Sequence, residues 1–166
     1  ALNELIKVAT ESKAAGDQKG ALNALEQALK LASSTNDKKA EALILRSAAE
    51  TARELGATDV AVNYIGKAIE LNKTLKNARG RSLDLIVAGK ILHDKQRYTD
   101  ALGAFEEAMK ILPASEQAET PVILGSSADI LIRLQRYQDA LSALNRLGSY
   151  YVKNNITQAQ AANHVK

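Results

Sequence analysis

The chain has 166 residues, enough for one compact domain or one short repeat array. It has no cysteine, which excludes disulfide scaffolds, zinc-ribbon sites and thiol catalysis. The net charge of +3 is too small to indicate nucleic acid as a partner, and no apolar run is long enough to cross a bilayer. We therefore expect neither nucleic-acid binding nor membrane insertion.

The first half of the chain shows two pairs of predicted helices. Apolar residues at helical spacing predict a helix over 1–15, a break at Gly16-Asp17 and a second helix that ends in the polar loop 33–37. Asp37 is placed to cap a third helix, which ends at Leu55-Gly56. The fourth helix then begins at Thr58 or Asp59.

The second half continues the pattern with a helix from about Asn77, its partner from about Thr99 and an end near Pro113. The next helix has two possible starts. Position 115 or 116 is in register with the earlier repeats, whereas Thr120-Pro121 offers a capping hydroxyl and a proline at the first helical position. We favour a short turn from 115 and a regular helix from Pro121. A capping box at 157–160 predicts a last helix over 157–166.

The helices repeat with a period of about 40 residues. Small or apolar residues recur in the columns Ala21, Ala61, Ala101, Ala140; Leu25, Ile65, Phe105, Leu144; Ala28, Ala68, Ala108, Leu147; and Ala9, Ala49, Gly89, Ala128. This period predicts an all-α fold: a right-handed α-solenoid of four tandem helix-turn-helix repeats, with a C-terminal partial or capping helix. We place the repeats at about 1–36, 37–76, 77–114 and 115–154, in a single array that we expect to be a fragment of a longer protein.

These columns resemble the tetratricopeptide repeat, a pair of antiparallel helices with small residues where they touch. The third block matches best, through Leu85, Ala88, Gly89, Leu92, Tyr98, Ala101, Phe105, Ala108 and Pro113. The period is longer than the usual ~34 residues and equals that of HEAT repeats, but the Gly, Ala and Tyr columns favour a long tetratricopeptide variant.

The resemblance implies that the first helix of each repeat lines a concave groove. Residues beside the packing stripe then form the predicted partner-binding set: Ile6, Thr10, Lys13, Arg46, Glu50, Arg53, Ile86, Lys90, His93, Asp129 and Arg133. This mixed lining suits a protein or peptide with acidic and apolar residues. The alternative is internal pairing, since Arg46 and Glu50, and Asp129 and Arg133, each stand four apart.

Enzyme signatures are absent from the sequence. It has no phosphate loop and no helical histidine pair for a metal, and the adjacent His93 and Asp94 would point in different directions on a helix. We therefore predict a non-catalytic protein–protein interaction scaffold without metal or cofactor. The alternatives are a regulatory or sensory segment of a larger signalling protein and a self-assembly module. The compartment is not fixed, with a cytoplasmic location slightly favoured.

Overall fold

The computed structural model describes residues 1–113 and 117–154, and this part of the chain is helical with no strand. The helices are α1 (Leu2–Ala14), α2 (Gln18–Ser34), α3 (Lys38–Glu54), α4 (Thr58–Thr74), α5 (Ala78–Asp94), α6 (Tyr98–Ile111), α7 (Thr120–Arg133) and α8 (Tyr137–Lys153). They form four consecutive pairs, which confirms the predicted all-α helical-repeat fold.

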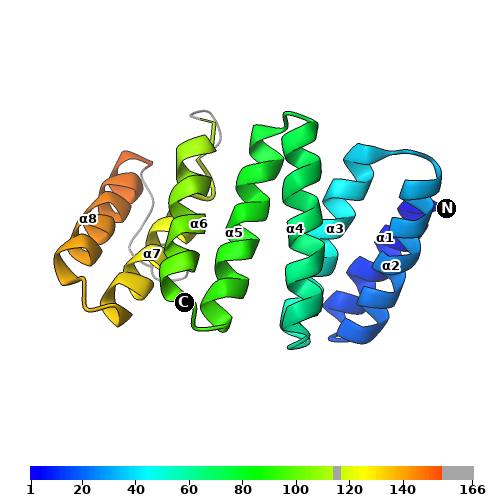
Figure 1. Ribbon diagram of the computed structural model, residues 1–166, viewed down its shortest axis with the longest axis horizontal. Coiled ribbons are helices and arrows are strands. Elements are labelled where there is room, and N and C mark those ends of the chain that lie inside the picture. The colour runs from blue at the N-terminus through cyan, green and yellow to red at the C-terminus, as the bar shows by residue number, and fades with distance from the viewer. Residues whose placement is uncertain (114–116, 155–166) are drawn as a thin grey trace.

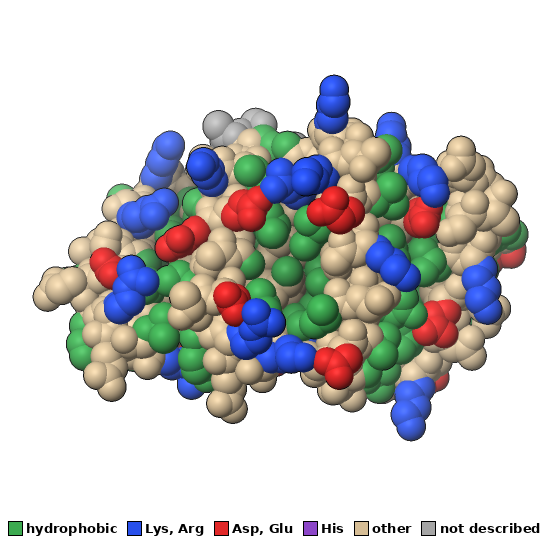
Figure 2. Space-filling model, viewed as in Figure 1, with side chains coloured by type: hydrophobic (Ala, Val, Ile, Leu, Met, Phe, Trp, Pro, Cys, Tyr) green, Lys and Arg blue, Asp and Glu red, His purple; other side chains and the backbone are tan. Residues whose placement is uncertain are grey.

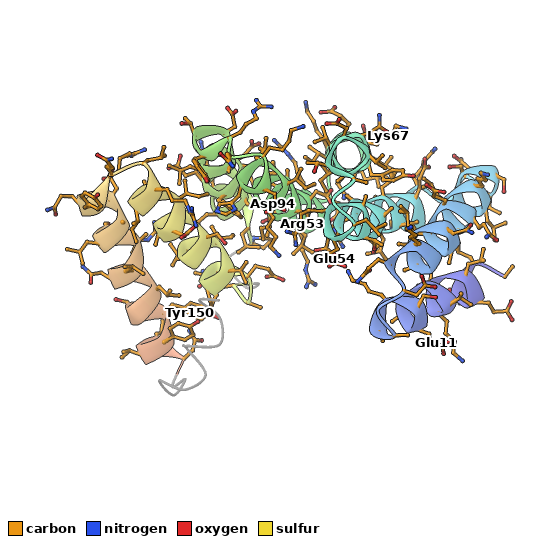
Figure 3. The ribbon with its side chains drawn as sticks, turned by 90° about the horizontal axis from the view of Figure 1, so that it is seen from below. Glu11, Arg53, Glu54, Lys67, Asp94 and Tyr150 are labelled. Carbon is orange, nitrogen blue, oxygen red and sulfur yellow. The ribbon has the colours of Figure 1, made fainter. Side chains whose placement is uncertain are left out.

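The helix pairs follow one another across the molecule, from α1 and α2 at one end to α7 and α8 at the other (Figure 1). Each helix packs against the next one in the chain, and α3 also contacts α5 directly. Seen from below, the array is arched, with both ends bending toward the same side (Figure 3). The first helices therefore form an inner row and the second helices lie outside it.

The turns between helices repeat one backbone geometry. Gly16, Gly56, Gln96 and Gln135 occupy the same position of each pair and all have positive φ. After the first of them, the amide of Asp17 donates to the carbonyl of Ser12 at 2.8 Å, a bond that closes the helix end. The Asp17 side chain then accepts from the amide of Gly20 at 2.9 Å and so caps α2. One short turn thus ends a helix and starts the next.

The start of α7 differs in detail from its prediction. Pro121 lies in the first turn, as expected. The predicted capping by Thr120 is wrong, because Glu119 is the N-terminal flanking residue and no side chain caps the helix. Thr120 is instead a buried residue within the helix. The predicted turn at 115 and the terminal helix over 157–166 lie outside the described residues.

The core follows the predicted columns. Ala21, Ala61 and Ala101 are fully buried, since their small side chains let the two helices of a pair approach closely. The column of larger residues is also buried in the first three repeats, where Phe105 is only 1% exposed. Its member in α8, Leu144, is 40% exposed. The core is thus a continuous row of nested helix pairs that leaves part of α8 uncovered.

Candidate partner-binding face

All the residues of the predicted partner-binding set lie on α1, α3, α5 and α7, the first helices of the four pairs. Figure 3 labels three charged residues on the inner side of the arch, Arg53 and Glu54 of α3 and Asp94 of α5, whereas Lys67 of α4 lies on the outer side. The row of first helices is therefore the inner face of the array.

Ion pairs join α1 to α3 and α3 to α5 along the inner face. Lys13 of α1 lies 3.0 Å from Glu54 of α3. Arg53 of α3 donates to Asp94 of α5 at 2.9 Å. These pairs are partly exposed, so each contributes at most about 1 kcal/mol to stability. Their common effect is to fix the spacing of the inner helices.

The middle of the array holds a buried polar network. The carboxylate of Asp84 on α5 is completely buried and accepts hydrogen bonds from Arg46 of α3, at 3.1 Å, and from Asn72 of α4, at 2.6 Å. Asn72 in turn accepts from the side-chain amide of Asn77, whose own oxygen caps α5 through the amide of Gly80. The network connects the three helices α3, α4 and α5 and includes the N-terminal cap of α5.

Burial raises the pKa of the Asp84 carboxyl above its ordinary value of 3.8. The hydrogen bond from Asn72 and the charge of Arg46 act in the opposite direction and favour the carboxylate. Gly80 is required beside this network, because a Cβ there would lie 2.6 Å from the Asn72 side-chain oxygen. Asp84 thus supplies the buried charge, and Gly80 leaves the space that the Asn72 side chain needs.

A second cluster connects α5 and α7. His93 Nε2 lies 3.1 Å from Asp129 Oδ2, and Arg133 donates to the same oxygen at 2.9 Å. The Arg133 guanidinium also stands 5.7 Å from the centre of the Tyr98 ring, within the range of a cation–π contact. Desolvation opposes ionisation of Asp129, but the bonds from Arg133 and His93 outweigh it and lower the pKa of this carboxyl below 3.8.

Six members of the predicted set are thus engaged within the protein: Lys13, Arg46, Arg53, His93, Asp129 and Arg133. The pairing that we considered between Asp129 and Arg133 is present. The pairing of Arg46 with Glu50 is not the contact that the structure shows, because Arg46 reaches the buried Asp84 instead. Internal pairing therefore takes up most of the positive charge that the sequence places on this face.

The other members differ in what they offer to a partner. Ile86 is 5% exposed and packs in the core, so almost none of its side chain is accessible. Ile6 is partly exposed, and the Thr10 hydroxyl donates to the Ile6 carbonyl. Glu50 and Lys90 are also partly exposed, and within residues 1–113 and 117–154 neither forms an ion pair. These two are the charged members of the predicted set that remain for recognition.

Within the same described ranges, no cluster of three or more histidine, cysteine or carboxylate side chains is arranged to hold a metal ion. The helices found there are also too short or too polar to cross a membrane.

The nested helix pairs define a helical-repeat protein. The chain belongs to the soluble NSF attachment protein (SNAP) family, whose model matches residues 1–165. This family is built of helical repeats of the tetratricopeptide-like kind and mediates protein interactions as an adaptor. Its model does not name the tetratricopeptide repeat itself, so membership of a long tetratricopeptide variant stays a prediction.

The crystal structure of BtubC (BKLC) from P. vanneervenii has a similar fold. The TM-score is 0.84 at 16% sequence identity, over 93% of this chain and 64% of that chain. The present chain thus spans less than two thirds of the length of that protein, and the likeness concerns the fold alone. No curated protein matches the sequence at a significant level.

Proposed function

We propose that the chain is a non-catalytic adaptor that binds a protein or peptide segment on its inner face. The observation that carries this proposal is the row of first helices fixed side by side by inter-repeat ion pairs, between which Glu50 and Lys90 remain available. A surface that is already ordered loses little conformational entropy on binding. The family name, which describes attachment to another protein, supports the same function.

The chemistry of the partner follows from the charges that remain. Lys90 favours a carboxylate and Glu50, one repeat earlier, favours a cation, so the partner segment carries charges of both signs. Leu43, also on the first helix α3, is half-exposed and adds an apolar side chain for contact with the partner. This refines the simple expectation of an acidic partner, because the other cations of the face already have acidic neighbours.

The test is charge reversal at a residue that the fold does not need. We expect Lys90→Glu to lower capture of a partner about tenfold, as for the loss of one charged contact at an interface. The measurement is quantitative mass spectrometry of proteins recovered on the tagged full chain from extracts of its own cells. Reversal of Arg46 is unsuitable, because it would leave Asp84 as a buried unpaired charge and would report on folding.

Lys67→Glu is the matched control, since Lys67 is exposed on the outer side of the array (Figure 3). The same proteins should be recovered with this variant as with the unchanged chain. Equal recovery with Lys90→Glu and Lys67→Glu would remove the inner face from the account of binding.

Self-association is the second candidate, and the surface of α8 supports it. Leu141 and Leu144 are 52% and 40% exposed, although the column of Leu144 is buried in the three earlier repeats. An apolar helix face of this kind can pair with another molecule. The regulatory or sensory role within a larger signalling protein has no comparable structural observation and stays a prediction.

A further inference from the structure

Tyr64 shows how the space between two outer helices is filled. It belongs to α4, and its ring packs against two apolar clusters that include residues of α2, α3 and α4. Its hydroxyl donates a hydrogen bond of 2.7 Å to Glu26 of α2. Burial raises the pKa of Tyr64 to about 12, and the Glu26 carboxylate acts in the same direction. One tyrosine thus spans the interval from α4 to α2 across α3.

The equivalent interval between α6 and α8 lacks this ring. The repeat register that aligns Ala61 with Ala140 places Ala143 at the position of Tyr64. The same register places Glu106 of α6 at the position of the acceptor Glu26. The acceptor of the interaction is therefore repeated in the sequence, whereas its donor is not.

A cavity of about 280 Å³ lies where that ring would be. It is bounded by three helices and lined by Phe105, Glu106 and Met109 of α6, Leu124 of α7 and Ala143 of α8. Figure 1 shows α7 between α6 and α8, as α3 lies between α2 and α4. A cavity of ~150 Å³ is enough to hold benzene, so this one has room for a phenol ring.

The cavity is lined by charges of both signs, and Glu106 among them can accept a hydrogen bond from a phenol hydroxyl. Glu106 is exposed, and the structure shows it in no hydrogen bond within the described residues. Two arginines also line the cavity: Arg136, which donates to Asp139 at 2.8 Å, and Arg146. Basic and acidic side chains are interspersed on the face of the molecule that Figure 2 presents.

We propose that this cavity is a second interaction site that receives a tyrosine side chain of a partner protein, with the phenol hydroxyl donating to Glu106. The five tyrosines of the chain, Tyr64, Tyr98, Tyr137, Tyr150 and Tyr151, are at described positions, and none lines this cavity. The ring must therefore come from another molecule. The site lies between outer helices, so it is separate from the inner face and does not depend on the function proposed above.

The single methionine of the chain provides a direct probe, because Met109 lines the cavity. We expect N-acetyl-tyrosinamide to shift the ¹³C-methyl signal of Met109 in the full chain, in a saturable way and with an affinity on the order of 1 mM. N-acetyl-phenylalaninamide should bind roughly tenfold more weakly, since a hydrogen bond to a charged group is lost. The O-phosphorylated tyrosinamide should bind more weakly than the tyrosinamide, because its phosphorylated oxygen has no proton to donate to Glu106.

Three variants locate the effect. Ala143→Tyr supplies the missing ring from within and should abolish binding of the probe. Ala104→Tyr is its control, because Ala104 holds the same register position in the third repeat and does not line the cavity. Glu106→Ala should leave the phenylalanine probe unaffected and remove the preference for tyrosine.

Equal binding of the tyrosine and phenylalanine probes, tighter binding of the phosphorylated probe, or undiminished binding by Ala143→Tyr would each overturn the proposal. A Met109 shift that depends on protein concentration alone, and that disappears in Tyr137→Ala, would show that Tyr137 of a second copy of the chain occupies the cavity. That result would also overturn the proposal. None of these outcomes bears on partner capture by the Lys90→Glu variant. Either proposal can therefore fail while the other stands.

Discussion

Asp84→Ala is expected to lower the free energy of unfolding by about 3–5 kcal/mol, the usual cost of removing one partner of a buried ion pair. The carboxylate is fully buried between Arg46 and Asn72, and its loss leaves both donors without their acceptor. Urea denaturation of the variant followed by circular dichroism measures the change. Asp84→Asn should cost less, because the amide oxygen can still accept from Asn72.

Asp94→Ala is the matched control for this prediction. Arg53 and Asp94 join the same two helices, α3 and α5, but their side chains are 27% and 42% exposed. Loss of this pair should therefore cost no more than about 1 kcal/mol. Equal effects of Asp84→Ala and Asp94→Ala would contradict the central role that we assign to the buried network.

The same carboxyl makes stability depend on pH in a defined direction. Because the folded protein raises the pKa of Asp84 above 3.8, the folded state holds this proton more tightly than the unfolded state does. The contribution of Asp84 to stability is then largest below pH 3.8 and decreases as the pH rises through the folded-state pKa. The difference in stability between the unchanged chain and Asp84→Asn, measured against pH, isolates this contribution.

Gly89→Ala is expected to destabilise the protein by about 1–3 kcal/mol, as overpacking of a filled core does. A Cβ at this position would lie 2.8–2.9 Å from three atoms of the Phe105 ring, so this buried ring would have to shift. The better helix propensity of alanine offsets part of this cost. Thermal unfolding of the variant gives the net change.

The remedy for this clash is visible in the other repeats. At the positions that correspond to Gly89 and Phe105, the first repeat has Ala9 and Leu25, and the second has Ala49 and Ile65. An alanine thus occurs with an aliphatic residue, and the glycine occurs with the phenylalanine. Phe105→Leu should therefore restore most of the stability lost by Gly89→Ala, as a double-mutant cycle would show.

Gly66→Ala, in an exposed helical position with no atom within 4 Å, should instead stabilise the protein by about 1 kcal/mol. A loss of stability in Gly66→Ala, or no rescue by Phe105→Leu, would refute this explanation.

The helices and their pairing could be predicted because they depend on local signals. The alanine columns mark helix contacts, and the break at Gly56 coincides with a residue of positive φ. The same turn geometry at Gln96 and Gln135 gives no comparable signal, since glutamine does not favour that conformation. These turns were placed by the period of the repeat rather than by their own residues.

The buried network was not predicted, because a single aspartate resembles any solvated charge. The repeat register did contain a signal. Asp84 occupies the column of Ile44 and Ile123, which are both 1% exposed, and Asn72 occupies the column of the fully buried Ala32. A polar residue in an otherwise buried column indicates a polar contact within the core.

The partner-binding set was predicted by position and not by contact. Its members do lie on the first helices, but a sequence does not show that Arg53 would meet an acidic residue 41 positions away. Contacts between repeats depend on the inclination and spacing of neighbouring helices, which packing determines. This is why the sequence overestimated the positive charge that the inner face leaves available.

Site-specific photo-crosslinking of the full chain tests the binding face most directly. A benzophenone amino acid placed at Glu50 on the inner face, and in a separate protein at Lys67 on the outer side, is irradiated in extracts of the chain's own cells. Binding on the inner face predicts that the protein lost in the Lys90→Glu experiment is crosslinked from position 50 and not from position 67. Crosslinking of that protein from position 67 alone would contradict the account.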